Sequence, residues 1–180
     1  MGFEAFVERI RRERKLTIEV PGFDSENGNE YAKFLFLLEA PGPKALESRQ
    51  ISFDNSDPTA RNLKRQLSEA GICRRDIALW NIVPWYVGTW TQSKRRIRPA
   101  KRSDLIEAEP YLRALLEHMP LLETIVLVGK KAREAHTMLS RTTQARVVAC
   151  HHPSAQSLNS DKRRDAENVE IFRLIRSSTL

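Results

Sequence analysis

The chain contains only two cysteines, Cys73 and Cys150, which lie far apart in its 180 residues. A structural zinc site or an iron–sulfur cluster uses several cysteines at short spacing, so neither is expected. The four histidines also lack a metal-binding spacing such as His-Glu-x-x-His. We therefore expect no metal ion and no other cofactor. Sparse cysteines suit a reducing compartment, and we expect a cytoplasmic protein.

Long apolar runs and several familiar motifs are missing as well. The apolar runs are too short to span a bilayer, and the first residues lack the basic flank and apolar core of a secretion signal, so no membrane partner is expected. Residues 129–131, Gly-Lys-Lys, lack the upstream glycine and the following Ser or Thr of a phosphate-binding loop. Ser154 lies outside a Gly-x-Ser-x-Gly elbow, which argues against a serine hydrolase.

Positive charge is what the sequence has in excess. Lysine and arginine number 30 against 23 acidic residues, which gives a net charge of +7. Such a domain attracts polyanions through phosphate contacts. Residues 92–102 carry six basic side chains and no acidic one, close to Trp85, Tyr86 and Trp90. Basic groups interleaved with aromatic rings favour contact with a nucleic acid, although a solvated charged face gives the same run.

Apolar runs alternate with helical segments along the chain. Runs at 34–38, 77–83, 124–128 and 145–150 predict strands that are buried on both faces. Helices are predicted at 3–15, 58–70, 103–118, 129–139 and 161–175, and polar loops at 44–57 and 86–102. This pattern predicts one domain over residues 1–180 with an N-terminal amphipathic helix. Its fold class is α/β, a three-layer α/β/α sandwich with a central four-stranded parallel sheet. We expect a monomer.

Three of the four predicted strands end near a conspicuous polar side chain. Glu39 precedes Ala-Pro-Gly-Pro, Asn81 lies inside an apolar run, and His152 follows the last strand. In open α/β sheets ligands bind at the carboxyl ends of the strands, so we expect the three to converge on one site. Each also has an ordinary alternative: a solvated loop carboxylate, a structural amide and a structural histidine.

These features, in their order and spacing, resemble the uracil-DNA glycosylase superfamily over residues 33–176. The matching segments are Leu38–Gly42, Phe53, Trp80–Val83, Val126–Gly129 and His152–Ser154. Glu-Ala-Pro-Gly is closest to the thermostable iron–sulfur branch, and His-Pro-Ser to the general uracil-excising branch. The resemblance implies a monofunctional repair enzyme that flips uracil out of single- or double-stranded DNA. It would hydrolyse the N-glycosidic bond and leave an abasic site.

The resemblance also implies a role for each residue. Phe53 would stack on the flipped base, and Asn81 would read its Watson–Crick edge. His152 would hydrogen-bond the departing uracil oxygen, and Glu39 would stabilise the sugar cation or position water. Ala40 and Ser154 would contact the substrate. DNA contacts would come from Pro41, Gly42, Pro43, Lys94, Arg95, Arg96, Arg98, Gln156 and Leu158. Gln156 and Leu158 would fill the gap in the base stack, unless Leu158 packs locally.

Several positions depart from the family pattern. Without the four cysteines of the iron–sulfur branch, no cluster is expected. Ala40 stands where the general branch has an aspartate, so Glu47 or Asp54 could share the role of Glu39. A branch that traps uracil covalently has a histidine where this chain has Arg98, so no covalent trap is expected. The residue that excludes thymine could be Pro43, Ala45 or Glu47.

Two rival functions fit the same residues. Because Ala40 replaces an acid, a member that binds uracil or damaged bases in DNA with little or no turnover is the stronger rival. A nucleotide-binding α/β protein of another kind fits less well, because no phosphate-binding loop is present. For either DNA-directed function, the expected location is the cytoplasm, in association with the nucleoid.

Overall fold

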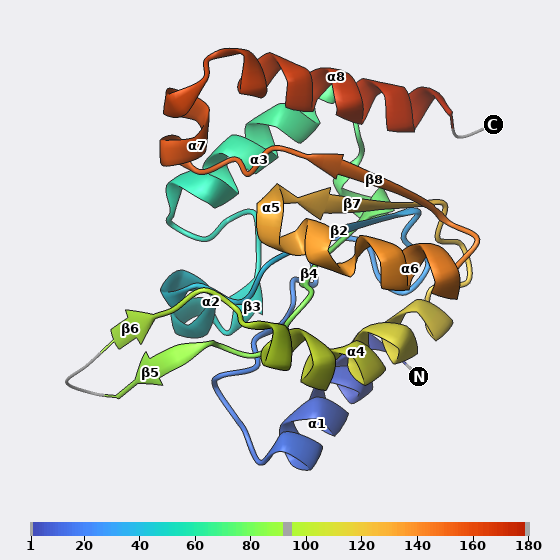
Figure 1. Cartoon of the computed structure of the whole chain (residues 1–180). Coiled ribbons are helices and arrows are strands. Elements are labelled where there is room, and N and C mark those ends of the chain that lie inside the picture. The colour runs from blue at the N-terminus through green and yellow to red at the C-terminus, as the bar shows by residue number, and fades with distance from the viewer. Residues whose placement is uncertain (1, 92–94, 179–180) are drawn as a thin grey trace.

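Four parallel strands form the centre of the protein, which a computed structural model describes over residues 2–91 and 95–178 (Figure 1). They are β2 (Phe34–Leu38), β4 (Ile77–Asn81), β7 (Thr124–Val128) and β8 (Arg146–Cys150), in the order β4-β2-β7-β8. The two inner strands, β2 and β7, are almost wholly buried, as expected for a parallel sheet covered on both faces.

Helices cover both faces of this sheet. On one face, α3 (Pro58–Ala70) packs beside α8 (Arg163–Ser177), whose Phe172 meets Phe36 of β2 edge to face. On the other face, Phe6 of α1 (Phe3–Arg14) meets the ring of Trp80. Helix α4 (Arg102–Glu117) forms an ion pair with α1 and donates a hydrogen bond from Arg113 to Thr142 of α6 (His136–Thr142), which joins these helices in one layer. The predicted three-layer fold is confirmed.

Some segments that were predicted as loops contain short regular elements. Residues 44–57 overlap α2 (Pro43–Ser48) and contain β3 (Gln50–Ile51), which pairs with β1 (Gly22–Phe23). Residues 86–102 include an antiparallel pair, β5 (Gly88–Trp90) and β6 (Arg95–Ile97). A side chain at position 88 would meet the Arg96 carbonyl oxygen at 2.1 Å, so glycine permits this close pairing. These elements were predicted as loops because their sequences are polar.

The remaining boundaries differ in detail from the prediction. Residues 129–142 form α5 (Gly129–Ala132), a 3-10 turn η2 (Arg133–Ala135) and α6, and a second 3-10 turn, η1 (Arg74–Asp76), precedes β4. An unpredicted helix, α7 (Ala155–Ser160), follows β8. Helix α4 begins earlier than predicted, because the Asp104 carboxylate accepts a hydrogen bond from the Lys101 N–H and closes the first turn. No described helix is long and apolar enough to cross a membrane.

Candidate functional site

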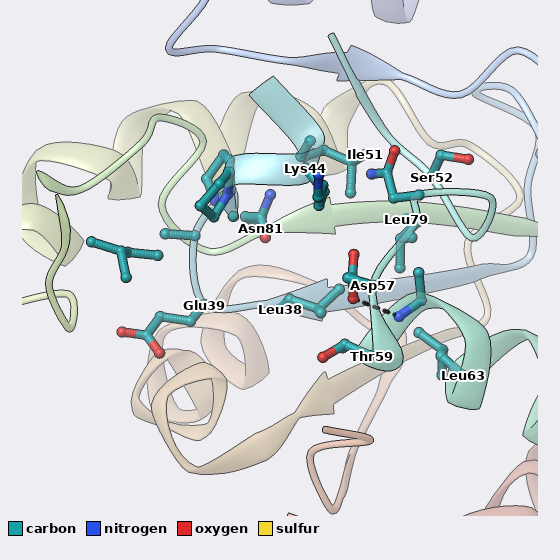
Figure 2. A pocket seen from close by; sticks show the side chains of 18 of the residues that line it. Leu38, Glu39, Lys44, Ile51, Ser52, Asp57, Thr59, Leu63, Leu79 and Asn81 are labelled. Atoms are coloured by element: carbon teal, nitrogen blue, oxygen red, sulfur yellow. Dashed lines mark hydrogen bonds between the residues drawn. The ribbon is translucent and has the colours of Figure 1, made fainter. Parts of the chain in front are cut away.

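A cavity of about 520 Å³ opens at the carboxyl ends of β2 and β4 (Figure 2). Glu39, Asn81 and His152 all line it, so the three strand ends do come together. Figure 2 shows the Glu39 carboxylate at one end of the cavity and Thr59 and Leu63 at the other. The volume is in the range of ligand pockets, and the wall is largely apolar with a few polar groups, as such pockets usually are.

Backbone and side-chain hydrogen bonds fix Glu39. Its carbonyl oxygen accepts a bond of 3.0 Å from the Val83 N–H, which extends the pairing of β2 with β4 past the strand ends. Its Oε1 accepts a bond of 2.6 Å from the backbone N–H of Ala100. One carboxylate oxygen is therefore held by the segment that follows β6, while the side chain is half-buried in the cavity wall.

Asn81 is the last residue of β4 and is 3% exposed. Its Nδ2 has no hydrogen-bond partner among the described residues. A buried donor that is left unpaired costs about 1–3 kcal/mol of stability. Because Asn81 lines the cavity, a bound molecule with an acceptor would satisfy this donor. Asn81 thus offers an unpaired donor at the wall of the cavity.

His152 follows β8 and faces the cavity. Its Nδ1 accepts a hydrogen bond of 3.2 Å from the Ser154 N–H, which assigns the proton of the neutral ring to Nε2. Burial lowers the pKa of His152, and the carboxylates of Glu39 and Asp57 only partly oppose this. The ring is therefore neutral at pH 7 and keeps an Nε2–H donor.

Gly129 provides the space for the His152 ring. Its φ is +86°, and a Cβ at this position would lie 3.0 Å from both Cβ and Cδ2 of His152. Glycine is thus required twice, for its backbone conformation and for the close approach of the imidazole. The segment Val126–Gly129 is one of those that resemble the family, and these two requirements explain why it ends in glycine.

Two asparagines that sequence reasoning missed hold the backbone around His152. Asn168 of α8 accepts a 2.8 Å hydrogen bond from the His151 N–H and donates one of 3.0 Å to the His151 carbonyl. Asn62 of α3 donates a 2.8 Å bond to the Pro153 carbonyl. The segment is therefore fixed from both helices of this layer. Polar residues inside amphipathic helices give little signal of such a role in the sequence.

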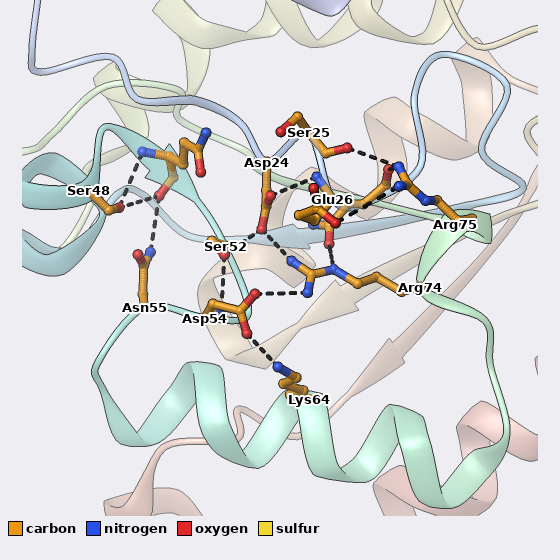
Figure 3. A network of polar contacts seen from close by, with 12 residues as sticks. Asp24, Ser25, Glu26, Ser48, Ser52, Asp54, Asn55, Lys64, Arg74 and Arg75 are labelled. Atoms are coloured by element: carbon orange, nitrogen blue, oxygen red, sulfur yellow. Dashed lines mark hydrogen bonds and ion pairs between the residues drawn. The ribbon is translucent and has the colours of Figure 1, made fainter.

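Phe53 is buried and lines the cavity, and the residues on both sides of it belong to one polar network (Figure 3). Ser52 donates a bond of 2.5 Å to Asp24, which also accepts one of 2.6 Å from Arg74. Arg74 bonds Asp54 at 2.8 Å, and its guanidinium lies 5.9 Å from the Phe53 ring. This network fixes the short loop that presents the aromatic ring to the cavity.

The structure also separates the carboxylates that were considered besides Glu39. Glu47 pairs with Lys44, and Asp54 pairs with Arg74 and Lys64; neither Glu47 nor Asp54 lines the cavity. Asp57 does line the cavity. The sequence did not indicate this, because Asp57 was interpreted only as a helix cap. It is indeed the cap of α3, where one of its oxygens accepts a 3.0 Å bond from the Ala60 N–H. Of the positions considered for thymine exclusion, Pro43 and Ala45 line the cavity and Glu47 does not.

The remaining residues predicted to contact the substrate (Ala40, Ser154) or DNA are placed differently from one another. Ala40, Pro41, Gly42, Pro43 and Arg98 line the cavity, whereas Ser154, Gln156 and Leu158 do not. Ser154 caps α7, which contains Gln156 and Leu158, by accepting a 3.3 Å bond from the Ser157 N–H. Arg96 of β6 is exposed. Lys94 and the side chain of Arg95 lie outside the described residues. Within residues 2–91 and 95–178, no group of His, Cys, Asp and Glu side chains could hold a metal ion.

The unpaired amide of Asn81 leads to a prediction about stability. Asn81→Leu should leave the free energy of unfolding unchanged or raise it by about 1 kcal/mol, because it removes a buried donor without a partner. As a control, Asn168→Leu should lower it by about 2 kcal/mol or more, because the His151 N–H and carbonyl lose their partners. Urea denaturation measures both. A loss of more than about 1 kcal/mol for Asn81→Leu would show that the amide is paired.

The contact between Gly129 and His152 leads to a second prediction. Gly129→Ala should cost about 1–3 kcal/mol through its backbone conformation and should push the imidazole toward solvent. The His152 pKa, measured by NMR titration, should then rise toward its ordinary value of 6.5. Gly42→Ala is the matched control, because its φ is −84° and a Cβ there meets no atom within 4 Å. An unchanged His152 titration in Gly129→Ala contradicts the packing argument.

The same lowered pKa fixes the sign of one pH effect. Below about pH 6.5 the unfolded chain binds a proton at His152 that the folded chain does not, so stability falls as the pH drops through this window. His152→Gln removes the group that titrates. When the pH is lowered from about 7.5 to below about 6.5, the free energy of unfolding should therefore fall less in this variant than in the parent.

Known families and solved structures include matches to this chain. The family model of the uracil DNA glycosylase superfamily matches residues 25–176. A solution NMR structure from Methanosarcina acetivorans, described as a "putative Uracil DNA glycosylase", is similar in fold with a TM-score of 0.59. The alignment has 19% sequence identity and covers 87% of this chain and 98% of that one. Comparison with curated proteins gave no match. Since the family model spans most of its length, this chain belongs to the uracil DNA glycosylase superfamily.

Proposed function

We propose that this protein is a monofunctional DNA glycosylase that excises uracil from DNA and leaves an abasic site. The observation that carries the proposal is the unpaired, buried Nδ2 of Asn81 in the wall of a cavity that Phe53 and His152 also line. A flipped pyrimidine offers what each of these groups needs: a carbonyl acceptor, a ring face and a leaving-group oxygen. Family membership supports the same reaction class.

Recognition would rest on Asn81 and Phe53. A uracil ring in the cavity would accept a hydrogen bond from Asn81 Nδ2 through a carbonyl oxygen, which removes the cost of the unpaired donor. The ring would stack on Phe53, whose loop is held by Asp24 and Arg74. Flipping a base out of DNA costs a few kcal/mol, and these preformed contacts would offset part of that cost.

Bond cleavage would rest on His152 and Glu39. As the C–N bond breaks, the electron pair leaves with the base and the sugar becomes positive. The neutral His152 would donate from Nε2 to the uracil oxygen on which negative charge develops, without itself transferring a proton. Glu39 would stabilise the positive sugar or hold the water that attacks it. Because Ala40 replaces an acid, this role falls to the adjacent carboxylate, Glu39, which lines the cavity.

DNA itself would bind through the loop Pro41–Pro43, the β5–β6 hairpin and α7, all of which follow strands that end at the cavity. The basic character of the chain supports this, because phosphate contacts dominate the affinity of such proteins. An enzyme of this kind would act where chromosomal DNA lies, in the cytoplasm at the nucleoid, as a monomer.

The test is the release of uracil from single- and double-stranded oligonucleotides in excess chelator under single-turnover conditions. His152→Gln should lower the rate by ~100-fold or more, the scale of losing one preorganised donor. Asn81→Leu should lower it at least ~10-fold with DNA affinity changed less than about threefold, because it removes recognition of the base alone. Gly42→Ala is not a suitable control here, because Gly42 lies in the proposed DNA surface; Glu69→Gln, on the exposed side of α3, is suitable.

The rival function predicts a different outcome of the same assay. A member that only recognises uracil would bind uracil-containing DNA more tightly than the matched thymine-containing DNA and release no base. The replacement of an acid by Ala40 is the observation that favours it. Binding without release by the parent would therefore overturn the enzyme and leave the binding module.

Arg96 and Arg98 of the basic segment 92–102 should behave differently toward DNA. Arg96 is exposed, whereas both Nη atoms of Arg98 bond the Asp104 carboxylate. Arg96→Ala should therefore lower the slope of log affinity against log salt by ~1, the effect of one lost phosphate contact. Arg98→Ala should change this slope by clearly less. Equal slopes for both variants and the parent would show that the hairpin faces away from DNA.

A further inference from the structure

The segment 98–101 links the β5–β6 hairpin to α4, and Asp104 holds it at both ends. Asp104 is buried and accepts two hydrogen bonds from the Arg98 guanidinium, of 2.6 Å at Nη1 and 2.8 Å at Nη2. It accepts a third, of 2.6 Å, from the backbone N–H of Lys101. The Arg98 guanidinium lowers the pKa of Asp104, so this carboxylate is ionised at pH 7.

Between these two anchored residues lies the N–H that binds Glu39. Ala100 is 2% exposed and donates its 2.6 Å hydrogen bond to Glu39 Oε1. The Arg98 N–H in turn donates to the Val87 carbonyl at 2.9 Å, which ties the segment to the chain that leaves β4. The position of the Ala100 N–H therefore depends on contacts at residues 98 and 101.

We propose that Asp104 and Arg98 are positioning residues for Glu39. This proposal rests on the proposed glycosylase function and gives the pair a task in catalysis. Through Ala100 the pair holds Oε1 of Glu39, which leaves Oε2 in a fixed direction toward the sugar or the water. A helix cap needs only the bond from Lys101 to Asp104. The bidentate pairing with Arg98 adds geometric specificity, which a cap does not require. Catalytic groups need this kind of support, because small misplacements are costly.

Asp104 lies beside the site, whereas Arg98 forms part of its wall. Arg98 lines the cavity, yet its guanidinium is engaged by Asp104 and by the Pro99 carbonyl. Asp104 does not line the cavity. An effect of Asp104 on the reaction must therefore pass through its neighbours, and Glu39 is the reacting group at the end of this chain of bonds.

A double-mutant cycle with Asp104→Asn and Glu39→Gln tests the proposal. Asparagine keeps the shape and can still accept from the Lys101 N–H, so the helix cap is retained. In the parent background Asp104→Asn should lower the single-turnover rate by ~10-fold with DNA affinity changed less than about twofold. In the Glu39→Gln background the same change should add less than about twofold, because the group that it positions is already disabled.

Glu109→Gln is the matched control, since it removes an exposed ion pair with Arg113 on the same helix. Its rate should equal that of the parent. If Asp104→Asn has no effect on the rate, or lowers it equally in both backgrounds, Asp104 does not act through Glu39 and the proposal fails. Thermal unfolding verifies that each variant is folded. Arg98→Lys, which keeps the charge but not the bidentate contact, replaces Asp104→Asn if that variant does not fold.

A spectroscopic readout separates this proposal from the proposed function. A short bond to a carboxylate shifts the Ala100 amide proton downfield, and Glu39→Gln should move this resonance upfield. Asp104→Asn should move it in the same direction, and Glu109→Gln should leave it in place. If the parent releases no uracil, the proposed function fails and this resonance alone decides the positioning role. An Ala100 resonance that Asp104→Asn leaves unmoved overturns the proposal at any level of activity.

Discussion

The register of the parallel sheet is the constraint on which the site depends. Leu38 of β2 pairs with Asn81 of β4, and Val128 of β7 pairs with Cys150 of β8, so the strands end at one edge. Alternation along β4 directs Leu79 and Asn81 to the cavity, while Trp80 packs against Phe6 of α1 on the other face. A slip of one residue would exchange these faces and remove the amide from the site.

The site contains features that cost stability, and the surrounding framework offsets them. The donor of Asn81 is buried without a partner, Gly129 adopts a positive φ, and His152 is held in its neutral form by burial. In contrast, Asn168 has partners for both its oxygen and its nitrogen. Behind His152 the amide of Asn168 is therefore fully paired, whereas the Asn81 donor at the cavity wall is left for a ligand to satisfy.

Much of the fold and the meeting of three strand ends could be predicted, because both follow from uninterrupted apolar runs and from the topology of parallel strands. The hairpin at 88–97 and the helix at 43–48 could not, since short polar elements depend on tertiary contacts such as the approach of Gly88 to Arg96. Asp104 and Asn168 were missed for a related reason. Asn168 bonds the backbone of His151, and Asp104 bonds the Arg98 guanidinium and the Lys101 N–H. A periodic pattern does not encode such contacts.

The charges of this molecule fall into two groups, the exposed cations and the carboxylates of the cavity wall. The net charge of +7 favours a polyanion, yet the cations beside the cavity are neutralised locally, Arg98 by Asp104 and Lys44 by Glu47. The carboxylates of Glu39 and Asp57 in the cavity wall accept hydrogen bonds from the backbone N–H groups of Ala100 and Ala60. Salt screens exposed charges beyond about 10 Å, whereas groups in a cavity are screened much less. Attraction of DNA would thus depend on exposed residues such as Arg96, and the field at the scissile bond on the carboxylates. Under the proposed function, affinity for DNA and the rate of cleavage would vary independently, because different residues supply the two effects.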